Sequence, residues 1–237
     1  MERHFRQASG TLGPWRLRLT YDSAFEGHNL RALAEDPDGW MASDSARVLK
    51  HDRTTTVALV GSGDRRWAVK RFNTKNPWHF ARRSFQRSRA SICWDAALQL
   101  LDVGVATPRP VGWAEQRLGP LKGRSYYIAE YVIGTTLSEF LGRQNDSGVE
   151  VAVAQIGRIF RSLRAAGLSH GDMKASNFLV HRHQVYLLDL DAVRRHERGA
   201  RLDRACDRDR QRFLLNWVDQ PDLRTRFERI IPAQPAG

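Results

Sequence analysis

The sequence predicts an α+β protein whose first part is mainly antiparallel sheet and whose second part is mainly helical. Three β-prone runs follow one another closely between Ala46 and Phe72, and the short polar turns between them are typical of an antiparallel meander. Residues 149–166 carry apolar side chains at a spacing of three to four, which indicates an amphipathic helix. A chain of 237 residues can bury a full core, either as one large domain or as two small lobes.

The composition is that of a globular protein, with 41% hydrophobic residues. The two cysteines, Cys93 and Cys206, are too few for a disulfide framework and favour reduced thiols. No apolar run approaches the roughly 18–20 residues of a spanning helix. The first seven residues lack the apolar core of a signal peptide. We therefore expect a cytoplasmic protein.

The chain is strongly basic, with 38 Lys and Arg against 26 Asp and Glu and a formal net charge of +12. Such a balance favours nucleic acid, anionic membrane or phosphorylated partners, although an arginine-rich sequence can also reflect genome composition. Local clustering is more informative. Residues 65–94 contain interleaved aromatic side chains, no acid and nine basic residues: Arg65, Arg66, Lys70, Arg71, Lys75, Arg82, Arg83, Arg87 and Arg89. This basic segment predicts a surface for anionic lipid or nucleic acid; a solvated basic helix face is the alternative.

Two neighbouring stretches carry the polar side chains of a candidate site. Residues 169–180 form a polar loop that runs into a β-prone segment, and residues 186–191 form an apolar strand that ends in two carboxylates. The polar residues between them are few enough to turn a hairpin. The hairpin would bring Asp172, Asn177 and Asp189 to one end of a two-stranded ribbon.

This trio suits phosphoryl transfer, which needs a carboxylate to hold the attacking hydroxyl and oxygen ligands for Mg²⁺ on the nucleotide phosphates. Asp172 takes the role of the base, and Asn177 and Asp189 take the role of metal ligands. The alternative is a surface hairpin without chemistry, because turns favour Asp and Asn in any case.

The pattern His-Gly-Asp-x-x-x-x-Asn followed by apolar-apolar-Asp resembles the catalytic and metal loops of the protein-kinase-like fold. Lys70, in the third strand of the meander, resembles the strand lysine that holds nucleotide phosphates. Glu130 and Val132 stand where backbone groups of the kinase hinge bind adenine. Asp95 is the nearest acid in the next helix that could pair with Lys70. The resemblance implies a bilobal fold with a mainly antiparallel β N-lobe and a minimal helical C-lobe.

One kinase feature is missing from the sequence. The turn between the first two meander strands, His51-Asp52-Arg53-Thr54, contains no glycine. Backbone N–H groups would then cradle phosphates less well, and we expect side chains such as Arg53 and Thr54 to share that role.

Together the hinge, the catalytic loop and the Asp-Leu-Asp ending resemble the Kdo/heptose (WaaP-like) lipopolysaccharide core kinase family over about residues 45–218. Residues 107–110, Thr-Pro-Arg-Pro, recur in that family. The resemblance implies ATP and Mg²⁺ as cofactors, phosphate contacts from Lys70 and Lys174, and Asp191 as a further candidate residue.

The predicted domain organisation has four parts: an N-terminal extension over 1–44, an N-lobe over 45–132, a C-lobe over 133–230 and a disordered tail over 231–237. In the extension, the pattern predicts a strand over 15–21 and a helix over 29–34 that stops at Asp36-Pro37-Asp38-Gly39. In the C-lobe, residues 194–212 would form an arginine-rich lip, followed by one amphipathic helix around 213–217.

The function expected from the resemblance is ATP-dependent phosphorylation of a Kdo or heptose hydroxyl at the cytoplasmic face of a bacterial inner membrane, by a peripheral protein. The expected partners are the lipopolysaccharide core glycolipid and the anionic membrane surface, with no stable nucleic-acid partner. Two alternatives stay open: a small atypical kinase acting on protein or RNA-associated machinery, and a binding pseudokinase.

Overall fold

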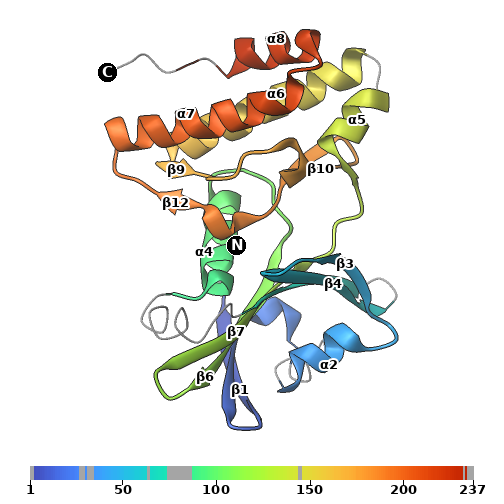
Figure 1. Cartoon of the computed structure of the whole chain (residues 1–237), viewed down its shortest axis with the longest axis vertical. Helices are drawn as coiled ribbons and strands as arrows, with labels where there is room; N and C mark the ends of the chain where they lie inside the picture. Colours follow the sequence, from blue (N-terminus) through green and yellow to red (C-terminus); the bar gives the residue numbers. More distant parts are fainter. Residues whose placement is uncertain are drawn as a thin grey trace. The chain divides into compact units, whose positions relative to one another are not determined.

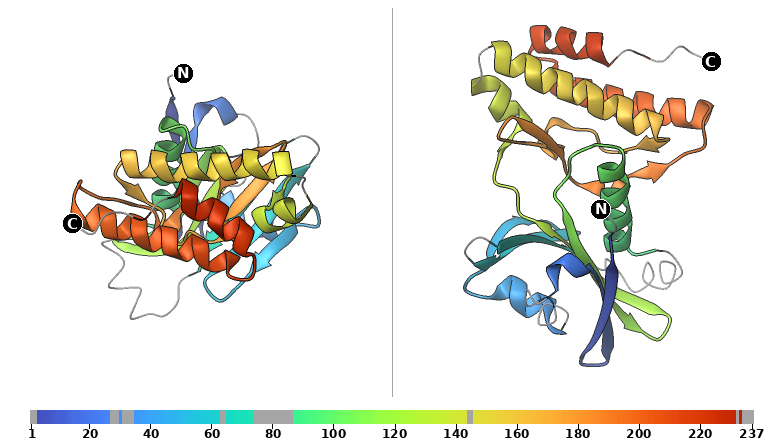
Figure 2. Two further views of the ribbon diagram at one scale, coloured as in Figure 1. Left: turned by 90° about the horizontal axis from the view of Figure 1, so that it is seen from above. Right: turned by 180° about the vertical axis from the view of Figure 1, so that it is seen from behind.

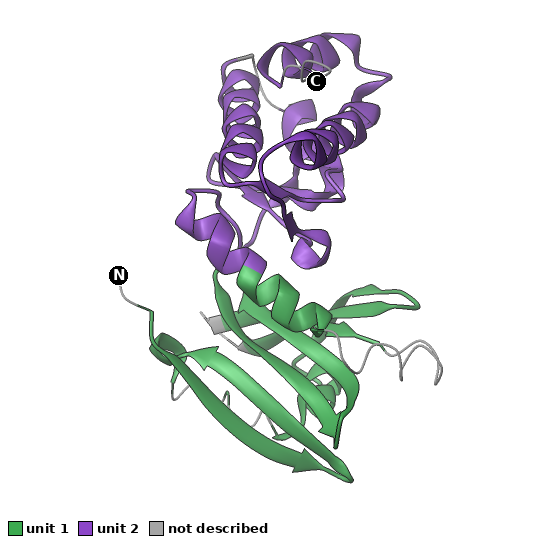
Figure 3. Ribbon diagram, turned by 90° about the vertical axis from the view of Figure 1, so that its left-hand side faces the viewer, with its two compact units in different colours: residues 1–95, 109–131 green, residues 96–108, 132–237 purple. Residues whose placement is uncertain are grey.

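The computed structural model describes residues 3–26, 30, 35–62, 65–73, 87–143, 146–231 and 233. The chain divides into two compact units (Figure 3). Unit 1 comprises Met1–Asp95 and Arg109–Tyr131, and unit 2 comprises Ala96–Pro108 and Val132–Gly237. Within the described part of the chain, no helix combines the length and apolar character needed to cross a lipid bilayer.

Unit 1 is built on a seven-stranded sheet with the order β1-β2-β6-β7-β5-β4-β3, in which all neighbours are antiparallel (Figure 1). The strands are β1 (Phe5–Leu12), β2 (Trp15–Asp22), β3 (Arg47–His51), β4 (Thr55–Ser62), β5 (Arg65–Phe72), β6 (Pro110–Leu118) and β7 (Leu121–Glu130). The predicted meander is confirmed as β3, β4 and β5. Their short connections keep sequential strands adjacent.

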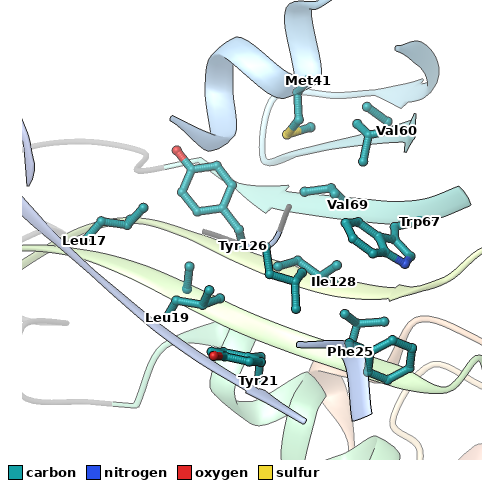
Figure 4. Close-up of a cluster of buried hydrophobic side chains, with 14 residues drawn as sticks. Leu17, Leu19, Tyr21, Phe25, Met41, Val60, Trp67, Val69, Tyr126 and Ile128 are labelled. Atoms are coloured by element: carbon teal, nitrogen blue, oxygen red, sulfur yellow. The ribbon is translucent and has the colours of Figure 1, made fainter. Parts of the chain in front are cut away.

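The N-terminal residues form part of this sheet, so the predicted separate extension over 1–44 is wrong. β1 and β2 form a hairpin, and β2 pairs with β6 far along the chain. Leu17, Leu19 and Tyr21 alternate along β2 and are all buried, as expected for one face of a strand. They pack in the core of unit 1 with side chains such as Tyr126 and Ile128 of β7 (Figure 4).

The residues predicted to stop a helix also begin one, which the sequence analysis missed. The short helix α2 (Pro37–Ala42) has Asp36 as its N-cap, whose carboxylate accepts the Gly39 N–H at 2.8 Å. Aspartate and proline are turn formers, but they also favour the N-cap and first position of a helix. η1 (Ser23–Phe25) precedes α2. The predicted helix over 29–34 lies outside the described residues except for Leu30.

Unit 2 is mainly helical and carries two small sheets, with strand orders β11-β10-β8 and β12-β9. Its helices α6 and α7 lie side by side, and α8 packs against both (Figures 1 and 2). Its elements are β8 (Thr135–Thr136), α5 (Leu137–Arg143), α6 (Asp146–Ala165), β9 (Leu168–Ser169), η2 (Ala175–Asn177), β10 (Phe178–His181), β11 (Gln184–Leu187), η3 (Leu190–Ala192), β12 (Arg194–Arg195), α7 (Ala200–Leu214), η4 (Leu215–Trp217) and α8 (Pro221–Ile230). Helix α4 (Arg89–Asp102) changes from unit 1 to unit 2 after Asp95.

The core of unit 2 gathers the apolar face of α6 and an aromatic cluster. Phe213 on α7 is fully buried and meets Phe178 of β10 and Phe227 of α8 edge to face, with ring centroids 5.4 Å and 4.8 Å apart. Edge-to-face packing of this kind stabilises a core beyond its buried area. It joins the hairpin β10–β11 to the C-terminal helices.

The C-terminal part of unit 2 corrects two further predictions. Most of the expected arginine-rich lip over 194–212 is helix α7, whose buried face includes Leu202 and Phe213. The single helix predicted around 213–217 is replaced by the end of α7, by η4 and by α8, which the sequence analysis missed. The predicted disordered tail lies outside the described residues except for residues 231 and 233.

Candidate active site

The predicted ribbon and its turn are confirmed. β10 and β11 pair antiparallel, with Phe178 opposite Leu187, and Arg182 and His183 turn the hairpin with positive φ. The loop before it carries Gly171 at φ +82°, and a Cβ there would lie 2.8 Å from the carbonyl oxygen of Ala192. Only glycine fits this conformation and this close approach without strain. The loop over 169–174 therefore leaves β9 with a fixed path into η2.

The Asp172 carboxylate lies between two cations and an amide. Lys174 Nζ is 2.9 Å from Oδ2, and Nε and Nη2 of Arg212 are each 3.3 Å from Oδ1. Asn177 Nδ2 donates to Asp172 Oδ2 at 3.3 Å and to its backbone carbonyl at 2.8 Å. Burial would raise the pKa of Asp172, but hydrogen bonding and charge from Lys174, with smaller help from Arg212 and Asn177, hold the pKa below its ordinary value. The carboxylate is therefore ionised at neutral pH, as a base must be.

His170 connects this loop to Leu188, the residue between the end of β11 and Asp189. Its Nε2 lies 2.9 Å from the carbonyl oxygen of Leu188, and its Nδ1 accepts the Asp172 N–H at 3.3 Å. A carbonyl oxygen only accepts and a backbone N–H only donates, so the imidazole is the neutral Nε2–H tautomer. The fully buried ring thereby fixes the backbone of Asp172 relative to the residue just before Asp189.

Helix α7 holds the same loop from the other side. The buried carboxylate of Asp209 accepts the N–H of His170 at 2.6 Å and the N–H of Gly171 at 2.8 Å. Burial raises the pKa of Asp209, although these two backbone donors favour its ionised form. A buried carboxylate with two backbone donors is a strong, directional anchor for the two residues before Asp172.

Asn177 and Asp189 lie at the same end of the ribbon, because the Leu188 N–H donates to the Asn177 carbonyl oxygen at 2.8 Å. Because the Asn177 side-chain nitrogen donates to Asp172, the side-chain oxygen of Asn177 points away from Asp172. Asp189 adopts a left-handed backbone conformation at φ 62°, which Asp tolerates better than most residues. The described residues contain no cluster of three His, Cys, Asp or Glu side chains. These two oxygen donors fit Mg²⁺, which typically takes few protein ligands beside phosphates and water.

Two buried polar side chains hold the hairpin in place. Gln155 of α6 donates to the carbonyl oxygen of His183 at 2.6 Å and accepts the Val185 N–H at 3.0 Å. At the opposite end, the Thr107 hydroxyl donates to the carbonyl oxygen of Leu187 at 2.7 Å. The Thr-Pro-Arg-Pro stretch thus has a structural role, since its threonine closes the end of β11.

The remaining predicted site residues divide between the units. Lys70 lies on β5 in unit 1, opposite Tyr127 of β7, with its Nζ 5.0 Å from the centroid of the Phe72 ring. The Glu130 N–H donates to the carbonyl oxygen of Arg109 at 2.9 Å, within unit 1. Val132 begins the second stretch of unit 2. Their predicted contacts with nucleotide stay predictions.

Asp95 lies near the first turn of α4 in unit 1, and its carboxylate forms a short ion pair with Arg87. Other members of the basic segment are also engaged within unit 1. Arg71 pairs with Asp38 at 2.9 Å, and the Arg89 guanidinium lies 4.5 Å from the centroid of the Phe72 ring. These arginines therefore contribute to folding as well as to charge. Lys75, Arg82 and Arg83 lie outside the described residues.

The turn without glycine is closed by a side chain. The Asp52 carboxylate accepts the N–H groups of Thr54 and Thr55 at 2.8 and 2.7 Å and both of their hydroxyls at 2.9 Å. These hydrogen bonds hold the pKa of Asp52 well below its ordinary value. The expectation that Thr54 contributes to a phosphate cradle is wrong for this conformation, because both of its donors are committed to Asp52.

Sequence reasoning missed three residues that contact the loop over 169–174 or the hairpin β10–β11: Gln155, Asp209 and Arg212. A signal was present for two of them. Gln155 and Asp209 stand on the apolar faces of their helices, where a polar side chain must find buried partners. Arg212 carried no such signal, because it is one of many arginines in α7.

Comparison with known proteins supports the resemblance to lipopolysaccharide kinases that the sequence motifs indicated. The family model described as the lipopolysaccharide kinase (Kdo/WaaP) family matches residues 40–222. Over 94 residues the chain is 31% identical to the lipopolysaccharide core heptose(I) kinase WaaP of Escherichia coli (strain K12); this match spans 37% of the chain and 36% of that relative's length. A solved structure of WaaP in complex with acyl carrier protein aligns with a TM-score of 0.63 at 18% identity, covering 89% of this chain and 88% of that chain.

The structural likeness establishes the fold, which is the bilobal protein-kinase-like fold with an antiparallel N-lobe and a small helical C-lobe. The family model covers most of both units, including the catalytic loop, the hairpin and α7. The chain therefore belongs to the lipopolysaccharide kinase (Kdo/WaaP) family.

Proposed function

We propose that the protein transfers the γ-phosphate of ATP to a sugar hydroxyl, of Kdo or heptose, in the lipopolysaccharide core. The observation that carries the proposal is the ionised Asp172 carboxylate, fixed within hydrogen-bonding reach of Lys174 and Asn177 near Asp189, which follows β11 by two residues. Family membership supports the substrate class.

In this reaction Asp172 accepts the proton of the attacking hydroxyl. The bond between the acceptor oxygen and the γ-phosphorus forms while the bond from that phosphorus to the β,γ-bridging oxygen breaks, and ADP leaves with that electron pair. Lys174, whose ammonium already contacts Asp172, offsets negative charge that develops on the transferred group. The neutral His170 ring and Asp209 act through the backbone and keep Asp172 oriented.

Asn177 and Asp189 would hold Mg²⁺ through their side-chain oxygens. The ion would neutralise charge on the β- and γ-phosphates. Lys70 for the phosphates, and the backbone of Glu130 and Val132 for adenine, complete the proposed nucleotide contacts. These last three assignments rest on the motifs alone.

We also propose that the protein acts at the cytoplasmic face of the bacterial inner membrane, as a peripheral protein. The support is the substrate class, a glycolipid, together with the net charge of +12. Basic residues near an anionic membrane surface each contribute roughly 1 kcal/mol of attraction.

The direct test compares the lipopolysaccharide core from cells with and without this gene by mass spectrometry. The proposal expects one phosphate fewer on the core when the gene is absent, and fragmentation identifies whether a Kdo or a heptose has lost it. Complementation with Asp172→Asn supplies the matched control. It should not restore the phosphate, because the amide cannot accept the proton.

Purified Asp172→Asn should lower kcat by orders of magnitude and leave nucleotide affinity nearly unchanged. An unchanged core in cells without the gene would contradict the proposed substrate. In that case phosphate transfer to protein would favour the atypical-kinase alternative, and nucleotide binding without any transfer would favour the pseudokinase alternative.

A further inference from the structure

Both oxygens of the Asp172 carboxylate are occupied. Oδ2 contacts Lys174 and Asn177, and Oδ1 contacts two nitrogens of Arg212. A base must offer a lone pair to the acceptor hydroxyl at about 2.6–3.2 Å. One of these contacts must therefore give way before an acceptor can react.

Arg212 is the contact that yields most easily. Its nitrogens are 3.3 Å from Oδ1, whereas Lys174 Nζ is 2.9 Å from Oδ2. Asn177 Nδ2 is also 3.3 Å from Oδ2, but Asn177 is buried and is held by a second hydrogen bond of 2.8 Å to the Asp172 carbonyl oxygen. The Arg212 side chain is 54% exposed, and it comes from α7 rather than from the loop itself. Exposed ion pairs of long side chains are weak, because solvent screens them and ordering the side chain costs entropy.

An anionic group is the partner that would draw Arg212 away. Nε and Nη2 of Arg212 both contact the same oxygen of Asp172. The bidentate geometry that a guanidinium prefers, with each nitrogen bonded to a different oxygen, is therefore not used. A carboxylate or phosphate on the acceptor offers two oxygens for that geometry. Arg208 is exposed one turn earlier on the same helix and adds a second positive charge to this surface.

We propose that Arg212 is a specificity residue that covers Asp172 until an anionic group of the acceptor takes its guanidinium and exposes Oδ1. The inference rests on the proposed function and names what that site selects: an acceptor with a carboxylate or phosphate close to the reacting hydroxyl. A neutral sugar or water offers Arg212 no better partner, so Arg212 stays bound to Asp172 and ATP is not hydrolysed.

The test measures phosphate transfer from ATP to three acceptors. These are a lipopolysaccharide core oligosaccharide, the same oligosaccharide with its carboxylates converted to neutral amides, and the same oligosaccharide with its phosphates removed. The variants are Arg212→Gln, Arg212→Lys and the matched control Arg201→Gln. Arg201 is exposed on the same face of α7 but lies eleven residues, or about 16 Å of helix, from Arg212.

Wild type should phosphorylate the unmodified oligosaccharide faster than an oligosaccharide that lacks the anion bound by Arg212. If the rate falls on amidation the anion is a carboxylate, and if it falls on removal of the phosphates the anion is a phosphate. Arg212→Gln should lower kcat/KM for the anionic acceptor by about tenfold or more, mainly through KM, as expected when a charge-assisted hydrogen bond is lost. Its kcat/KM for the neutralised acceptor should not fall. Arg212→Lys should recover part of the preference, and Arg201→Gln should match wild type.

A second readout needs no sugar acceptor. With Oδ1 uncovered, Arg212→Gln should hydrolyse ATP to water faster than wild type, a gain that a merely destabilised variant would not show. An Arg212→Gln protein that keeps the wild-type charge preference, or hydrolyses ATP no faster, overturns the inference. If wild type phosphorylates none of the acceptors, the proposed function fails, and the rate of ATP hydrolysis still decides whether Arg212 covers the base.

Discussion

Replacing Asp209 tests whether α7 holds the catalytic loop in its working position. The Asp209 carboxylate accepts the backbone N–H groups of His170 and Gly171, the two residues before Asp172. Asp209→Ala removes both acceptors at once. We expect a loss of stability in unit 2 and a loss of catalysis, although Asp209 touches neither nucleotide nor acceptor in the proposed mechanism.

The expected magnitude follows from the burial of the two donors. His170 is fully buried, and an unsatisfied buried N–H costs about 1–3 kcal/mol. Gly171 is exposed, so water can replace its lost acceptor and the cost there is about 0.5–1 kcal/mol. Removing a buried carboxylate recovers part of its desolvation energy, so the net destabilisation is about 1–3 kcal/mol. A shift of the loop by about 1 Å would lower kcat about a hundredfold.

The assay combines urea unfolding with hydrogen exchange. Exchange at the His170 and Gly171 amides should accelerate in Asp209→Ala, while amides of the unit 1 sheet should keep their rates. Asp207→Asn is the control, because Asp207 lies on the same helix and its carboxylate accepts a hydrogen bond from Gln211, one turn later, at 2.6 Å. It should change stability by less than about 0.5 kcal/mol. If Asp209→Ala matched this control in stability and in loop exchange, the anchoring role would be refuted.

Three further predictions concern the proposed metal ligand, a half-buried ion pair and the membrane. Asp189→Asn should keep the left-handed backbone and lose Mg²⁺-dependent ATP turnover; retention of more than about a tenth of the activity would contradict the assignment. Burial would raise the pKa of Asp38, but the ion pairs with Arg71 and Arg124 have the larger effect and lower this pKa in the folded protein. The ionised Asp38 therefore stabilises the fold above pH 3.8. This stabilisation is lost as the pH falls through the pKa of Asp38 in the folded state. Asp38→Asn should therefore be less stable than wild type at pH 7 in urea unfolding, with a difference that shrinks below about pH 4. Arg82→Glu with Arg83→Glu should reduce co-sedimentation with anionic vesicles at physiological salt; equal sedimentation would leave the basic segment as a solvated face.

Local patterns predicted the elements that depend on neighbours in sequence. The meander over β3–β5, the helix α6 and the hairpin β10–β11 each follow from periodicity and turn residues within about twenty positions. Sequence also predicted that Asp172 and Asn177 lie close together, since they share one short segment, and they are in hydrogen-bonding contact.

The failures share a physical cause, which is dependence on distant partners. β1 and β2 join the sheet only through β6, about a hundred residues later, so the N-terminal pattern alone could not show that it completes unit 1. Asp36 and Pro37 are suited both to end one helix and to begin another, and the sequence analysis used only the first property, so it missed α2. Because α7 is rich in charged residues, the sequence analysis did not recognise it as an amphipathic helix with a buried face that includes Asp209.

The β3–β4 turn shows how this chain departs from phosphate-binding loops rich in glycine. Such loops leave backbone N–H groups free to face an anion. Here the Asp52 carboxylate already receives the N–H and hydroxyl groups of Thr54 and Thr55, as a phosphate oxygen would. A nucleotide phosphate at this turn would have to displace a carboxylate of the same sign of charge. These donors of Thr54 and Thr55 are therefore not available to a phosphate in this conformation, which leaves the proposed phosphate contacts to Lys70 and Lys174.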